Sequence, residues 1–90
     1  MLISLDEIKK SIVNKGWEYS NKNIVKSFTF KSFSDSILFV NQIADIAESM
    51  NHHPVINIDQ LNVKISITSL DLNGITTKCI NLAMKIDSLN

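Results

Sequence analysis

The segment SFSDSILFVNQIADIAESMNHHP, residues 32–54, predicts the longest regular element of this 90-residue chain and also where that element must end. Ser32 and the acidic residue three positions later have the spacing of a helix N-terminal cap. Apolar residues then recur every three or four positions, at Phe33, Ile37, Val40, Ile43, Ala44, Ala47 and Met50. This spacing predicts a helix over about residues 33–50. Asn51 is expected to end it, because Pro54 disfavours helical geometry at the residue before it.

Two further apolar residues of this helix, Phe39 and Ile46, lie outside that stripe. They either complete a broad core face or mark a contact between subunits. A chain of this size gains stability from association, so both interpretations stay open.

The histidines at the end of this helix are the most promising reactive groups of the chain. His52 and His53 are its only two histidines, and histidine is the side chain that exchanges protons near neutral pH. The simplest interpretation is that they interact with the negative end of the helix dipole. Catalysis would need a cleft and a partner for each ring. Glu48, one turn before His52, is expected to orient that ring.

The remaining elements follow from capping signals and alternation. Ser4 and Glu7 form a capping box for a first helix over about residues 5–14. Thr76 is expected to cap a last helix, whose inward residues are Cys79, Leu82, Ala83 and Ile86. Strands are predicted at residues 17–20, 24–30 and 61–68. The predicted order is α-β-β-α-β-α. We therefore expect one α+β domain over residues 1–90, an antiparallel sheet with helices packed on one face.

Composition excludes several classes of function. Nine lysines balance nine acidic residues and arginine is absent, which disfavours direct binding to nucleic acid or to a membrane surface. The single Cys79 fits a reducing compartment, and the N-terminus has neither a signal peptide nor a membrane span, so a cytoplasmic location is expected. Adjacent histidines without a third ligand at suitable spacing do not predict a metal site.

The sequence resembles the pterin-4a-carbinolamine dehydratase family over nearly its whole length. The most specific motif is Glu48-x-x-x-His52-His53-Pro54, with Asn51 before the histidines. The other matching segments are Gly16-Trp17-Glu18, Ile24 and residues 28–33, Ile56 and Ile58, Val63, Ile65 and Ile67, Gly74-Ile75-Thr76, residues 81–83, and Ile86-Asp87. 

The resemblance implies a lyase that dehydrates 4a-hydroxytetrahydropterin to quinonoid dihydropterin without a metal or an organic cofactor, in the recycling of tetrahydrobiopterin. It implies that His52 and His53 are catalytic with Glu48, and that Asn51, His52 and His53 form one wall of a pterin slot. Thr68, Ser69 and Asp71 would belong to the other wall. A homodimer or homotetramer is also implied. Some relatives act as a dimerisation cofactor of a homeodomain transcription factor, and others are non-catalytic assembly proteins.

Three departures from the family pattern bear on activity. The family's third histidine falls at Leu70, an expected aromatic residue and the asparagine after it fall at Gln60 and Leu61, and an acidic residue that would pair with the Thr76 cap is replaced by Cys79. Loss of one imidazole predicts a weakened enzyme. The alternative is a family member with a decayed site that acts as a binding or assembly protein, with its oligomer surface around Phe39 and Ile46.

Overall fold

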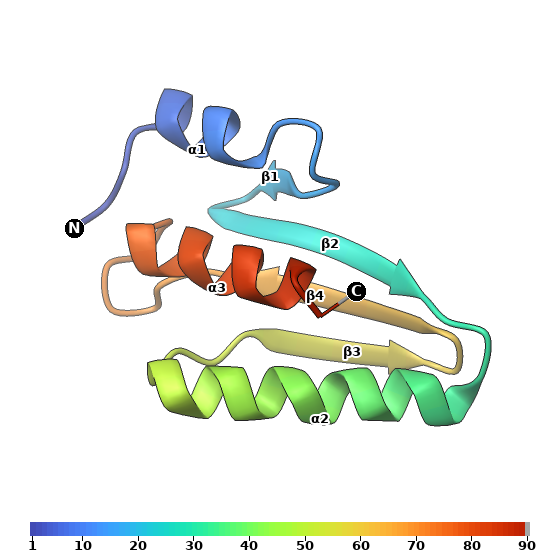
Figure 1. The fold of residues 1–90 in the computed structure, drawn as a ribbon. Helices are drawn as coiled ribbons and strands as arrows, with labels where there is room; N and C mark the ends of the chain where they lie inside the picture. The colour runs from blue at the N-terminus through green and yellow to red at the C-terminus, as the bar shows by residue number, and fades with distance from the viewer. Residues whose placement is uncertain (90) are drawn as a thin grey trace.

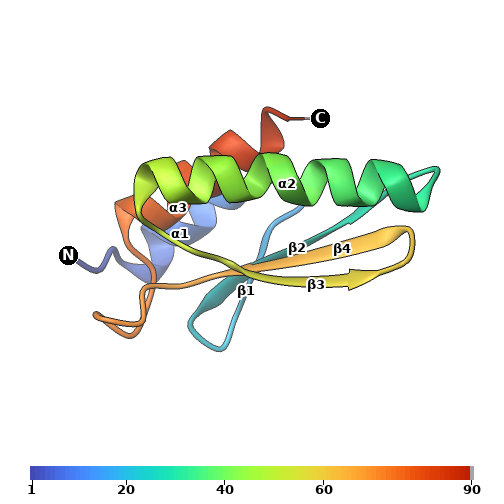
Figure 2. The ribbon, with the colours of Figure 1, turned by 90° about the horizontal axis from the view of Figure 1, so that it is seen from below.

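The computed structural model describes residues 1–89 and has two layers, with three helices on one face of a four-stranded antiparallel sheet (Figures 1 and 2). In chain order the elements are α1 (Leu5–Ile12), β1 (Glu18–Ser20), β2 (Asn23–Thr29), α2 (Phe33–Met50), β3 (Val55–Asp59), β4 (Asn62–Ile67) and α3 (Thr77–Asp87). The predicted α+β class and the helices on one face are confirmed.

The sheet has the order β1-β2-β4-β3, so the two long strands β2 and β4 lie at its centre. Their register pairs Ile24 with Ile67 and Phe28 with Val63, and all four side chains are buried. Because side chains alternate along a strand, these residues share the face that the helices cover. Between them, β4 contributes Ile65, which is also fully buried. 

The order predicted from the sequence was wrong by one strand, because residues 55–59 form β3. This strand pairs with β4 through a tight turn in which Gln60 has a φ of 52°. Neither turn residue is Gly, Asn or Pro, so the usual hairpin signal is missing. β3 also lies at the sheet edge, where most of its side chains are exposed and its hydrophobic alternation is weak.

The limits predicted for α2 are confirmed, but its buried face is rotated from the predicted stripe. Its buried residues are Ser36, Phe39, Ile43 and Ala47, whereas Phe33 is 57% exposed. Phe39 is only 2% exposed, so it is a core residue and not part of a contact between subunits. The oligomer surface expected around Phe39 and Ile46 was therefore wrong for Phe39, and Ile46 is partly buried against the same core. Apolar residues occur on more than one side of this helix, and its period alone does not choose among them.

Three chain segments meet at one end of the sheet, on the left in Figure 1: the end of α2, the exit of β4 and the start of α3. Asn51 ends α2 in the left-handed conformation, with φ 51° and ψ 46°. The backbone N–H of His52 then donates to Ala47 O at 3.0 Å, which turns the chain sharply after the helix. α3 packs against the hydrophobic core through four residues that are fully buried, as predicted: Cys79, Leu82, Ala83 and Ile86.

Candidate active site

The structure brings the turn after α2 together with the loop after β4 around a cavity of about 200 Å³. Its lining residues are Asn51, His52, His53, Thr68, Ser69, Leu70 and Asp71. These include every residue that the sequence predicted for the two walls of a substrate slot. Glu48 does not line this cavity, and it reaches the site through a histidine.

His52 points toward α3. Its Nε2 lies 3.3 Å from Sγ of the buried Cys79, and the ring is half-buried. Burial lowers the pKa of His52 below its usual value, and the positive charges of Lys78 and of protonated His53 lower it further. Each effect disfavours the imidazolium form. His52 is therefore held as a neutral ring at neutral pH.

His53 lies on the outer side of the turn. Its Nε2 is 3.2 Å from Glu48 Oε1, and the two side chains are 57% and 78% exposed. The prediction that Glu48 orients His52 was therefore wrong: Glu48 contacts the second histidine. The left-handed conformation of Asn51 interrupts the helical spacing. The carboxylate of Glu48 is therefore reached by His53, five positions later, and not by His52, four positions later.

The loop after β4 is fixed by its own hydrogen bonds. Ser69 and Gly74 exchange backbone hydrogen bonds of 2.8 and 3.2 Å, and Ser69 Oγ accepts from the backbone N–H of Leu72. The Thr68 hydroxyl donates to Lys22 O at 2.7 Å, which ties the loop to the β1–β2 turn. Both hydroxyls thus hold the wall in place. Thr68, whose O–H is already used, faces a substrate as an acceptor, whereas Ser69 keeps its O–H as a donor.

Leu70 and Asp71 form the tip of that loop. Leu70 is 90% exposed, the highest value among the exposed hydrophobic residues after Met1. An imidazole is expected at this position by resemblance, and here an apolar side chain stands at the rim instead. Asp71 is the only carboxylate that lines the cavity, so it is the remaining titratable group on this wall.

Three residues at the start of α3 were not assigned to the site from the sequence. A second cavity of about 590 Å³ shares Asn51, His52, Ser69 and Asp71 with the first and extends to Thr76, Thr77 and Lys78. Lys78 Nζ donates to Asn51 O at 3.4 Å, which joins α3 to the end of α2. Cys79 was correctly predicted to be buried, but its contact with His52 has no signal in the sequence other than the missing acid of the capping box.

Other parts of residues 1–89 offer less support for a catalytic or metal-binding site. The groove of about 710 Å³ between α1 and β1 is lined mainly by apolar residues and contains no histidine. Within residues 1–89, no three His, Cys, Asp or Glu side chains lie close enough together to hold a metal ion. In the same range, no helix has the length and hydropathy of a membrane span.

Comparison with known proteins identifies the family. The family model described as pterin 4 alpha carbinolamine dehydratase matches residues 1–89. A relative from Aquifex aeolicus, provisionally named pterin-4-alpha-carbinolamine dehydratase, is 38% identical over 88 residues, 97% of this chain and 89% of its own length. One from Sulfurisphaera tokodaii with the same provisional name is 41% identical over 75 residues, 83% of this chain and 81% of its own length.

Two solved structures share the fold. The crystal structure of a transcriptional coactivator/pterin dehydratase from Brucella melitensis has a TM-score of 0.94 and 27% identity, covering 99% of this chain and 98% of that one. A pterin dehydratase-like protein identified as a RuBisCO assembly factor in the alpha-carboxysome has a TM-score of 0.68 and 23% identity, covering 81% and 84%, and supports the fold alone. With its α-β-β-α-β-β-α order and its histidine pair at a cavity, this chain belongs to the pterin 4 alpha carbinolamine dehydratase family.

Proposed function

We propose that this protein dehydrates 4a-hydroxytetrahydropterin to quinonoid dihydropterin, as a 4a-hydroxytetrahydrobiopterin dehydratase in tetrahydrobiopterin recycling. The observation that carries the proposal is the placement of two imidazoles with different partners beside one cavity. In the reaction the C4a–O bond breaks, the hydroxyl leaves as water with an added proton, and the neighbouring ring nitrogen loses its proton. One group must donate a proton and another must accept one.

His53 suits the accepting role. Its Nε2 faces the Glu48 carboxylate, which can only accept, so Nε2 carries the proton in this pair and Nδ1 keeps a free lone pair. That arrangement leaves Nδ1 to take the proton from the substrate nitrogen, with the carboxylate stabilising the imidazolium that forms. His52, half-buried and neutral, is placed to donate a hydrogen bond to the departing hydroxyl. A water molecule supplies the proton that leaves with this hydroxyl, and His53 returns the proton it has taken to water, so that no net proton is gained or lost. General acid–base groups of this kind typically contribute about 10²–10⁴-fold in rate.

Binding of the pterin itself falls to the two walls of the cavity. The ring is planar and uncharged, so it needs hydrogen-bonding edges and a slot, which Asn51, Thr68 and Ser69 supply without any arginine. Asp71 or an ordered water takes over part of the work of the missing third imidazole. We expect no metal or organic cofactor to take part.

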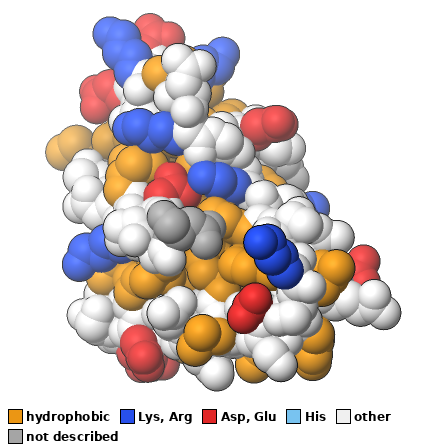
Figure 3. All heavy atoms as spheres, turned by 45° about the vertical axis from the view of Figure 1, so that its right-hand side comes forward, with side chains coloured by type: hydrophobic (Ala, Val, Ile, Leu, Met, Phe, Trp, Pro, Cys, Tyr) orange, Lys and Arg blue, Asp and Glu red, His pale blue; other side chains and the backbone are white. Residues whose placement is uncertain are grey.

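Assembly into homodimers or homotetramers in the cytoplasm is part of the proposal. The edge strand β3 has backbone groups that a second copy could pair with, and edges of this kind favour association. Hydrophobic side chains also gather on the face shown in Figure 3. Phe30, Leu38 and Leu89 line a cavity of about 190 Å³, and Leu38 is 58% exposed. Light scattering after size exclusion chromatography tests this part.

The proposed activity is tested by stopped-flow dehydration of 4a-hydroxytetrahydropterin. We expect His52→Ala and His53→Ala each to lower kcat/KM by roughly 10²-fold, because the first loses the hydrogen bond to the leaving hydroxyl and the second loses the proton acceptor. Leu70→His should raise kcat/KM by restoring a third imidazole at the cavity. Lys10→Ala, an exposed change on α1, is the control and leaves the rate unchanged. A wild-type rate equal to that of buffer, with no gain in Leu70→His, would exclude the enzyme.

The exposed Leu70 favours one alternative, a binding or assembly protein whose catalytic site has decayed. Titration with a stable pterin analogue distinguishes the two. The enzyme binds the analogue and loses that binding in Asn51→Ala, whereas an assembly protein gives no heat with either protein.

A further inference from the structure

Cys79 occupies an unusual place for a buried cysteine. It is fully buried on α3, at the third helical position after the Thr76 cap, and its Sγ contacts two polar groups. Thr76 Oγ1 lies 3.4 Å away and His52 Nε2 lies 3.3 Å away. A cysteine that only fills a core would contact apolar atoms alone.

The direction of these hydrogen bonds follows from the cap. Thr76 Oγ1 accepts the backbone N–H of Cys79 at 3.3 Å, so its own O–H is left to donate, and it points to Sγ. The sulfur accepts from Thr76, and within residues 1–89 the S–H has no acceptor other than His52 Nε2, so we assign the thiol as the donor of this contact. An Nε2 that accepts a hydrogen bond cannot carry the ring proton, which must then be on Nδ1.

We propose that Cys79 is a positioning residue that fixes His52 as the neutral Nδ1–H tautomer, with Thr76 orienting the thiol. Nδ1 has no hydrogen-bond partner among residues 1–89, so its N–H remains available to a ligand in the cavity that His52 lines. The tautomer does not depend on the proposed function, but its consequence for catalysis does. In the dehydration, His52 would donate a hydrogen bond to the leaving hydroxyl through Nδ1, whereas His53 would accept the proton of the ring nitrogen.

The surroundings of His52 agree with a neutral ring. Besides the Cys79 thiol, the titratable groups near it are Lys78 and His53, which add positive charge when protonated and lower its pKa, and Asp71, which lines the same cavity but is not among the causes of that lower pKa. The N-terminus of α3, at Thr77, has the positive end of its dipole on the same side. A carboxylate in place of Cys79 would oppose these effects and favour the imidazolium. The thiol gives a hydrogen bond without adding a negative charge.

The test is a long-range ¹H–¹⁵N spectrum of the imidazole groups of the full chain, with His52 and His53 assigned by substitution. In the wild type we expect an acceptor-type Nε2 and a protonated Nδ1 for His52, and the reverse for His53. Cys79→Ser retains a donor and keeps this tautomer. Cys79→Val removes the donor and shifts the tautomer ratio of His52 roughly 2- to 10-fold toward Nε2–H, the range that one neutral hydrogen bond allows.

Cys79→Asp provides a second measurement that a purely structural role would not change. We expect it to raise the pKa of His52 and to place a proton on Nε2. Thermal unfolding of each variant checks that it is folded. If Cys79→Val is unfolded, the tautomer of His52 in the wild type and in Cys79→Ser decides the inference. A protonated Nε2 in the wild type, or a tautomer ratio unaffected by Cys79→Val, overturns the inference. These spectra need no substrate, so they fail or succeed independently of dehydratase activity.

Discussion

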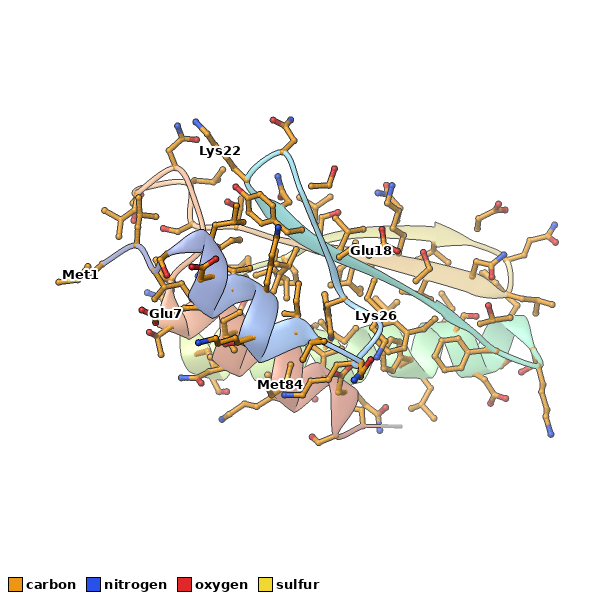
Figure 4. All side chains as sticks on the ribbon, turned by 90° about the horizontal axis from the view of Figure 1, so that it is seen from above. Met1, Glu7, Glu18, Lys22, Lys26 and Met84 are labelled. Atoms are coloured by element: carbon orange, nitrogen blue, oxygen red, sulfur yellow. The ribbon has the colours of Figure 1, made fainter. Side chains whose placement is uncertain are left out.

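The two ends of α3 carry polar clusters of different kinds. At the C-terminal end, both carboxylate oxygens of Asp87 are used: Oδ2 accepts from Trp17 Nε1 at 3.0 Å and Oδ1 from Lys26 Nζ at 2.8 Å. Lys26 also donates to Lys15 O at 2.7 Å, and Figure 4 shows its side chain beside the loop that follows α1. At the N-terminal end, Thr76 and Cys79 form only neutral hydrogen bonds, and these lead to His52 beside a cavity.

The two ends of α3 differ in whether their polar side chains keep a hydrogen-bonding group free for a ligand. Lys26 and Asp87 are only 21% and 22% exposed, so their charges are largely removed from water and must be compensated inside the protein. Both Asp87 oxygens, the Trp17 N–H and two of the Lys26 N–H groups have protein partners, which is how a structural cluster is built. The His52 cluster leaves one ring nitrogen for a ligand. A helix that is rigid at one end can thus hold a reactive side chain steadily at the other.

The largest expected effect is on the C-terminal cluster. Asp87→Ala leaves the Lys26 ammonium and the Trp17 N–H without their main acceptor, and we expect the free energy of unfolding to fall by roughly 2–3 kcal/mol. Urea denaturation measures it. Asp45→Ala, an exposed change of the same type on α2, is the control and should alter stability little. An equal effect of both changes would mean that the Asp87 cluster is not structural.

A smaller effect is expected at the other end. Thr76→Ala removes the helix cap and the hydroxyl that contacts Cys79, and should cost about 1–2 kcal/mol. Thr77→Ala removes the same hydroxyl one residue later, at an exposed position, and should be nearly neutral. Thr76→Ser should retain most of the stability in the same denaturation experiment. Similar losses in Thr76→Ala and Thr77→Ala would contradict the role given to the cap.

The pH dependence of stability separates the two histidines. Burial, and then Lys78 and His53, keeps the pKa of His52 lower in the folded protein than in the unfolded chain. The unfolded chain therefore binds more protons as the pH falls below the ordinary histidine pKa of about 6.5. The stabilising contribution is complete above that pH and is lost as the pH falls through the lowered folded pKa. His52→Gln should remove this loss in unfolding curves between about pH 5 and pH 7.5, whereas His53→Gln should retain it.

The smallest effect is expected from Lys78→Gln. Removing this charge takes away the second cause of the shift, so the pKa of His52 should rise toward its usual value while burial still holds it down. NMR titration of the ring protons gives the value directly. Lys85→Gln, at the other end of α3, is the control and should leave His52 unchanged. A lower pKa in Lys78→Gln would show that Lys78 acts in some way other than through its charge.

The location of the candidate site was predictable by resemblance, but its internal contacts were not. Resemblance placed Asn51, His52, His53, Thr68, Ser69 and Asp71 around one cavity, and the structure brings them together. The partners of the histidines could not be read from spacing, because the left-handed Asn51 changes the direction of the chain within one residue. Glu48 therefore contacts His53, and His52 contacts a residue 27 positions away.

The sequence by itself determined where the helices begin, where α2 ends and that the fold is α+β, because caps, breakers and hydrophobic period act over a few residues. The first helix, predicted to reach about residue 14, ends at Ile12. It predicted the limits of α2 and the buried residues of α3. Only the tertiary structure decided which side of α2 is buried, that residues 55–59 join the sheet as an edge strand, and which group each imidazole contacts. These depend on surfaces supplied by segments distant in the chain, and no local pattern specifies them.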